Sequence, residues 1–152
     1  MITSILGVDH AGVGVRDAAR MRSFYQDCFG FGTVLGEMPE EDHEAIHGLV
    51  RSSRAVHSAL LLGHEAGGLT LGLFHAIEPA PRPLRTNPRY GDIGVAKLTF
   101  SVPDLTAFCQ EKGDLLSLFS SPKSIALEGG GEYRFVYGKD PEGNLVEIVS
   151  DS

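Results

Sequence analysis

Two stretches of the chain share one skeleton, and this duplication is the feature that most restricts the fold. "DHAGVGVRD" (9–17) and "AKLTFSVPD" (96–104) each place a polar residue ahead of a valine and an aspartate at the same spacing. The matching positions are His10 with Lys97, Val15 with Val102, and Asp17 with Asp104. A repeat of roughly 75–85 residues is too long for a solenoid and indicates two copies of one module.

Each copy predicts a strand, a helix and three further strands. Asp17 is a favourable N-cap residue, and Met21, Phe24 and Cys28 follow it at helical spacing. Asp104 stands at the same place before a shorter helix. Further strands are expected at 31–37, 55–63, 66–74, 115–120, 132–138 and 141–149. The order βαβββ in both halves predicts an α+β fold.

The two expected modules span residues 1–78 and 94–152. Between them, at 79–93, prolines at 79, 81, 83 and 88 forbid helix and favour an extended linker. The last strands of the modules also correspond, because each has a glycine four residues before a key position. Gly68 precedes Gly72, and Gly143 precedes Glu147.

Charge and hydropathy narrow the range of partners. The net charge of -7, with scattered basic residues, argues against nucleic-acid binding, which normally requires a clustered positive face. No run of about 18 apolar residues is present, so we expect no membrane-spanning segment. The N-terminal stretch lacks the basic flank and cleavage site of a signal peptide, and a cytoplasmic location is therefore expected.

Four motifs in this order resemble those of the vicinal oxygen chelate superfamily, which includes glyoxalases, extradiol dioxygenases and bleomycin-resistance proteins. They are "DHAGVGVRD", "FYQDCFGFG", "GDIGVAKLTFSVPDL" and "DPEGNLVEIV". The resemblance implies two βαβββ modules whose curved mixed sheets enclose an open cavity. It also implies a small-molecule ligand and a homodimer.

In metal-using members of that superfamily, the first and last strands of each module supply one ligand each. The resemblance transfers these four positions to His10, Gly72, Lys97 and Glu147. Histidine and glutamate are usable ligands, but glycine has no side chain and a protonated lysine has no lone pair. Because a divalent site usually needs three or four protein donors, we expect no metal cofactor. If a metal ion is bound after all, His10 and Glu147 are its candidate ligands.

We expect the Lys97 ammonium to take over the role of the metal. It would pair with the Glu147 carboxylate and hold a substrate carbonyl or enolate by its charge. His10 would then move the proton, since unperturbed imidazole titrates near neutrality. The candidate catalytic residues are therefore His10, Lys97 and Glu147, and the expected chemistry is of the isomerase or lyase type.

Two other functions stay open at this point. Lys97 and Glu147 would form only a neutralising ion pair if the protein bound a drug or metabolite without turnover, as bleomycin-resistance proteins do. Alternatively, a metal-dependent dioxygenase would need displaced ligands, drawn from His43, His47 or His57.

The segment "HEAIH" (43–47) matches the zinc-protease pattern H-E-x-x-H. On a helix, His43 and His47 would share one face and Glu44 would serve as the base. However, Val50 and Ser53 occupy the positions where an extended pattern requires glycine and histidine. A mainly strand-forming chain also leaves little room for the supporting helices. We therefore expect an acidic loop or a short helix near a ligand entrance, rather than a protease site.

Overall fold

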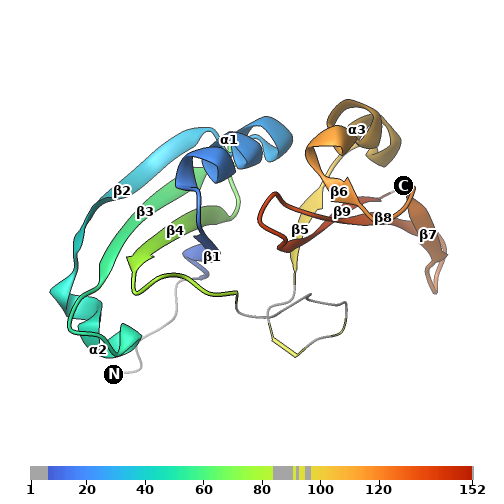
Figure 1. Cartoon of the computed structure of the whole chain (residues 1–152). Helices are drawn as coiled ribbons and strands as arrows, with labels where there is room; N and C mark the ends of the chain where they lie inside the picture. Colours follow the sequence, from blue (N-terminus) through green and yellow to red (C-terminus); the bar gives the residue numbers. More distant parts are fainter. Residues whose placement is uncertain (1–6, 84–90, 92, 95–96, 152) are drawn as a thin grey trace, which may run out of the picture. The chain divides into compact units, whose positions relative to one another are not determined.

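A computed structural model describes residues 7–83, 91, 93–94 and 97–151. The chain divides into two compact units, Met1–Arg82 and Pro83–Ser152, each of which is described by itself (Figure 1). Most of the linker expected at 79–93 lies outside the described residues.

The first unit has the expected βαβββ order. Its elements are β1 (His10–Val15), α1 (Ala18–Phe29), β2 (Thr33–Asp42), the 3-10 turn η1 (Glu44–Ile46), α2 (His47–Val50), β3 (Val56–Gly63) and β4 (Thr70–Glu78). The sheet order is β1-β4-β3-β2. The β1–β4 pair is parallel and the other pairs are antiparallel, so the sheet is mixed.

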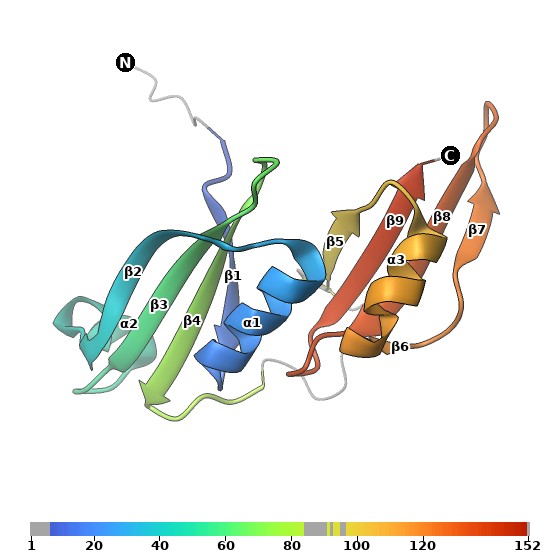
Figure 2. The same cartoon turned by 90° about the horizontal axis from the view of Figure 1, so that it is seen from above.

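Helix α1 lies along one face of this sheet (Figure 2). The Asp17 carboxylate accepts a hydrogen bond from the Arg20 N–H at 2.9 Å and caps the first turn. Gly30 ends the helix in the left-handed conformation (φ 77°), which glycine adopts without strain. The apolar side of α1 supplies much of the core through Met21, Phe24, Tyr25, Cys28 and Phe29.

The second unit repeats the plan with one difference. Its elements are β5 (Leu98–Ser101), α3 (Leu105–Lys112), the 3-10 turn η2 (Gly113–Leu115), β6 (Ser117–Leu118), β7 (Lys123–Ala126), β8 (Glu132–Lys139) and β9 (Leu145–Asp151). The sheet order is β5-β9-β8-β6, and β7 also pairs with β8. The strand expected at 115–120 is present only as the two residues of β6, and β7 is an additional strand that was not expected. Pro122 lies between β6 and β7 and has no N–H to donate to the sheet.

The two units place corresponding residues in corresponding registers. Gly68 (φ 94°) and Gly143 (φ 90°) form left-handed turns, and β4 and β9 each begin two residues later. Gly12 is the β1 partner of Gly72, whereas Thr99 is the β5 partner of Glu147. His10 and Lys97 each lie two residues before that partner. The structure therefore agrees with their equivalence in the sequence repeat.

Within the described part of the chain, no helix is long and apolar enough to cross a membrane.

Candidate functional site

A tight turn positions the carboxylate at the centre of the second unit. Asp140, which is 3% exposed, accepts hydrogen bonds from the Glu142 N–H (3.0 Å) and the Asn144 N–H (2.8 Å). The Asn144 side-chain amide donates to the other Asp140 oxygen at 2.8 Å. The motif "DPEGN" thus sets the β8–β9 register, which places Glu147 opposite Tyr137.

Glu147 is the acceptor of a buried polar cluster that also contains Lys97, Thr99 and Tyr137. The Lys97 ammonium donates to Glu147 Oε2 at 2.5 Å and to the Tyr137 hydroxyl at 3.0 Å. The Thr99 hydroxyl donates to the same carboxylate oxygen at 2.8 Å. The Glu147 side chain is 2% exposed and that of Lys97 is 30% exposed. Lys97 is therefore the more accessible member of the ion pair.

The surroundings keep both members of the ion pair charged. Burial alone would raise the pKa of Glu147, but hydrogen bonds from Lys97, Tyr137 and Thr99 outweigh it and lower the pKa. Burial alone would likewise lower the pKa of Lys97, but Glu147 and Tyr137 raise it above its usual range. Burial raises the pKa of Tyr137, which keeps its phenol protonated.

These shifts restrict what the cluster does chemically. A general acid or base works best with a pKa near the working pH, which requires a raised pKa for Glu and a lowered pKa for Lys. Here the pKa of Glu147 is lowered and the pKa of Lys97 is raised, which is the opposite of both requirements. The Lys97–Glu147 pair is therefore suited to keeping its charges fixed rather than to transferring protons.

In the first unit, His10 is held by its neighbour. His10 Nδ1 lies 2.7 Å from a carboxylate oxygen of Asp9. Since a carboxylate only accepts, Nδ1 must be the donor, and the neutral ring then carries its lone pair on Nε2. The ring lies beside Gly72: a Cβ added at Gly72 would be 3.1 Å from His10 Cδ2. The catalytic role of His10 stays a prediction.

The Phe74 ring explains why position 72 is a glycine. A Cβ at Gly12 would lie 2.9 Å from Phe74 Cε2, and a Cβ at Gly72 would lie 2.7 Å from the same atom. The first unit thus holds an aromatic ring where the second unit holds the side chains of Thr99 and Glu147.

Two members of the cluster, Thr99 and Tyr137, were not predicted from the sequence. Thr99 and Tyr137 contact Lys97 or Glu147 directly but were not among the candidate residues. Strand periodicity offered a signal for Thr99, which lies two residues after Lys97 and so shares its face. Tyr137 became identifiable only once the β8–β9 register was known.

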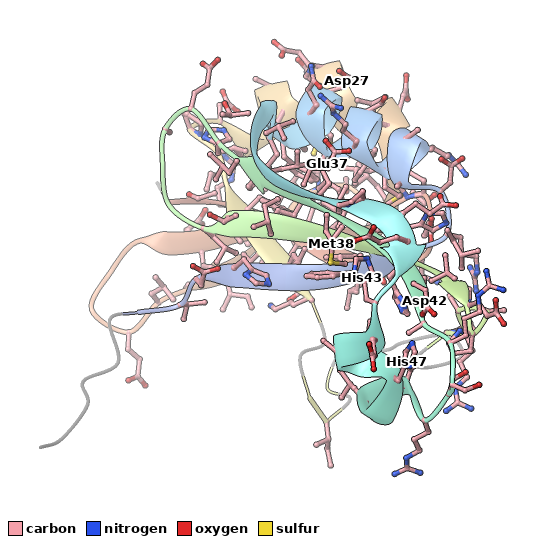
Figure 3. The ribbon with its side chains drawn as sticks, turned by 90° about the vertical axis from the view of Figure 1, so that its left-hand side faces the viewer. Asp27, Glu37, Met38, Asp42, His43 and His47 are labelled. Atoms are coloured by element: carbon pink, nitrogen blue, oxygen red, sulfur yellow. The ribbon has the colours of Figure 1, made fainter. Side chains whose placement is uncertain are left out.

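The H-E-x-x-H segment does not form one continuous helix. His43 precedes η1 with an extended backbone (φ -97°, ψ 90°), and α2 begins only at His47. His43 Nε2 contacts the carbonyls of Pro39 and His57, both at 3.2 Å, while His47 Nε2 lies 2.7 Å from Asp42 Oδ1 (Figure 3). Among the described residues, no three His, Cys, Asp or Glu side chains gather as a metal site. These contacts of His43 and His47 attach the segment to the ends of β2 and β3, which it connects.

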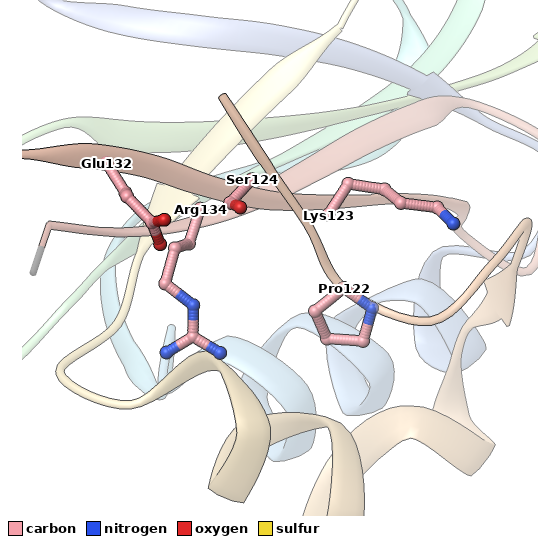
Figure 4. Close-up of a pocket in the computed structure, with 5 residues that line it drawn as sticks. All are labelled: Pro122, Lys123, Ser124, Glu132 and Arg134. Atoms are coloured by element: carbon pink, nitrogen blue, oxygen red, sulfur yellow. The ribbon is translucent and has the colours of Figure 1, made fainter. Parts of the chain in front are cut away.

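An open hollow lies beside the β7–β8 pair and is lined by a proline and by polar and charged residues (Figure 4). They are Pro122, Lys123, Ser124, Glu132 and Arg134. Arg134 alternates with Tyr137 along β8, so the two lie on opposite faces of the sheet. Its guanidinium donates to the Thr106 hydroxyl at 3.1 Å. We interpret this contact as a link between β8 and α3 rather than as part of the Lys97 cluster.

Comparison with known proteins gives a consistent result for the fold. The family model described as "Glyoxalase/Bleomycin resistance protein/Dioxygenase superfamily" matches residues 7–148. A glyoxalase family protein from Bacillus cereus superposes with a TM-score of 0.79 at 14% identity, covering 98% of this chain and 96% of that one. TnmS3, an antibiotic binding protein from a Streptomyces species, gives 0.60 at 22% identity, covering 99% and 100%. No curated protein matches.

Proposed function

Because this chain belongs to the glyoxalase/bleomycin resistance protein/dioxygenase superfamily, we propose that it acts on a small molecule through a carbonyl or carboxylate oxygen held by Lys97. The single observation that supports this proposal is the partly exposed Lys97 side chain, whose ammonium is fixed by the buried Glu147 carboxylate and the Tyr137 phenol. Such a cation is preorganised, so it stabilises negative charge on an oxygen without the cost of reorganising water.

The chemistry we propose is a proton shift of the isomerase or lyase type, without a resident metal ion. The residues at the four inherited positions do not fit a divalent cation. Gly72 offers no donor, Lys97 is a cation, and Glu147 Oε2 already accepts from Lys97 and Thr99. In this proposal Lys97 holds the enolate oxygen and Glu147 orients Lys97. His10, in the other unit, is the candidate proton acceptor from the sequence repeat, and His10→Gln tests that role separately.

Hydrogen–deuterium exchange tests this chemistry directly. Pyruvate in D2O, followed by proton NMR, reports enolisation at the carbon next to its carbonyl. We expect the protein to accelerate this exchange, Lys97→Met to weaken binding and exchange together, and His10→Gln to abolish exchange with pyruvate still bound. Exchange that persists unchanged in Lys97→Met would refute the proposal. So would a stoichiometric metal ion that is lost in Glu147→Ala.

The alternative is a protein that binds its ligand without turnover. The raised pKa of Lys97 and the lowered pKa of Glu147 favour it, because both groups then stay charged and neither is suited to transferring a proton. TnmS3 is an example of an antibiotic binding protein with this fold. In the exchange experiment, ligand binding that depends on Lys97 without any acceleration of exchange selects this alternative.

A further inference from the structure

Three aromatic side chains follow the Lys97 cluster along β8. Tyr133, Phe135 and Tyr137 alternate with other residues of the strand and therefore share one face of the sheet. Their ring centroids are 5.7 Å apart between Tyr133 and Phe135, and 5.6 Å between Phe135 and Tyr137. All three are half-buried. We call this row the aromatic stripe.

The stripe runs from Lys97 at one end to the edge formed by β7 at the other. At the first end, Lys97 Nζ lies 5.1 Å from the centroid of the Tyr137 ring. At the other end, Tyr133 is paired with Ile125 of β7, which is 56% exposed, and with Asp151 of β9. Phe135, in the middle, is paired with Lys123 of β7. Strand β7 pairs with β8, so the Tyr133 end lies near an edge of the sheet. A ligand lying along this face would have the Lys97 ammonium at one end and the aromatic stripe beside the rest of its length.

We propose that the aromatic stripe seats a planar ring of the ligand whose oxygen Lys97 holds, so that the ligand class is aromatic carboxylates and aromatic carbonyl compounds. This inference rests on the proposed function and adds the ring to it. Tyr133 and Phe135 are stacked and Tyr137 meets Phe135 edge-on, so the row already has the spacing at which aromatic rings pack. Aromatic pairs contribute beyond the area that they bury. The cation at one end fixes which end of the ligand carries the oxygen.

The charge at the end of the stripe favours a small acid over a second protein surface. A protein partner lying flat on the stripe would also cover the Lys97 ammonium, and it would need its own buried acceptor there. A carboxylate or enolate oxygen of a small molecule supplies that acceptor and leaves the rest of the ligand apolar.

Two acids that differ by one phenyl group test the proposal. Phenylpyruvate and pyruvate share the 2-oxo acid group, and each is titrated into the full chain while amide shifts are followed by NMR. We expect phenylpyruvate to bind about tenfold more tightly than pyruvate, since an aromatic contact gives roughly 2- to 13-fold beyond area burial. In Phe135→Leu this ratio should fall several-fold, with pyruvate affinity unchanged.

Matched variants separate loss of the ring from loss of the fold. Phe135→Tyr keeps the ring and should keep the ratio. Phe100→Leu makes the same change on β5, where Phe100 alternates with Thr99 and so lies on the opposite face of the sheet, and it should also keep the ratio.

Three results would overturn the inference. The first is an equal ratio in the wild-type protein and Phe135→Leu with pyruvate still bound through Lys97, which would leave the proposed function standing. The second is a dimer that dissociates in Phe135→Leu, which would assign the stripe to a second copy of the chain. The third is that neither acid binds, which would refute the proposed function and the inference that rests on it.

Discussion

Replacing Lys97 with methionine should reverse the pH dependence of stability in the second unit. The methionine side chain retains most of the apolar stem but leaves Glu147, 2% exposed, without its cation. Removing one partner of a buried pair costs about 3–5 kcal/mol. Because Lys97 is 30% exposed and Thr99 and Tyr137 still contact the carboxylate, we expect the lower end, about 3 kcal/mol at pH 7.

The sign of the change in stability with pH follows from the direction in which the pKa of each group is shifted. In the wild-type protein the pKa of Glu147 lies below its unfolded value, so its contribution is present above the unfolded pKa and is lost as pH falls through the folded pKa. The raised pKa of Lys97 affects stability only at alkaline pH. In Lys97→Met, burial is no longer offset by the ammonium, the pKa of Glu147 rises, and stability should decrease from pH 4 to pH 7.

Urea unfolding and amide exchange measure this effect. We would follow far-UV circular dichroism at pH 4, 5.5 and 7, and hydrogen exchange in β9 to isolate the second unit. The double variant Lys97→Met/Glu147→Leu removes both charges and should recover most of the loss. A penalty below about 0.5 kcal/mol, the usual value of an exposed ion pair, or one that does not change with pH, would refute the reasoning.

Three further changes test other parts of the two units. Gly72→Ala should destabilise the first unit by about 1–3 kcal/mol in thermal unfolding, because the new Cβ would lie 2.7 Å from Phe74 Cε2, and a second change, Phe74→Leu, should relieve it. Asp140→Ala should lower the free energy of unfolding of the second unit by about 1–3 kcal/mol, since it leaves N–H groups of the β8–β9 turn unpaired, whereas Asp140→Asn should cost less. Asp9→Asn should move neutral His10 away from the tautomer protonated on Nδ1, as read from its ring nitrogen shifts by NMR; an unchanged tautomer ratio would mean that Asp9 does not orient the ring.

Local patterns in the sequence predicted much of the fold. The N-caps at Asp17 and Asp104 depend on backbone groups within a few residues of each side chain. Such short-range interactions are visible in a linear sequence. The additional strand β7 was missed, although Pro122 was a signal that the chain interrupts its pairing after β6.

The sequence by itself determined the duplicated βαβββ plan and the equivalence of His10 and Lys97, because spacing and periodicity are properties of a linear chain. Only the tertiary structure decided what surrounds those two residues. Tyr137 is 40 residues from Lys97 along the chain, and the Phe74 ring occupies the space above Gly72. Both contacts depend on strand register and rotamers, which follow from the packing of many distant residues. The same packing sets the burial and hydrogen bonds that keep the Lys97–Glu147 pair charged.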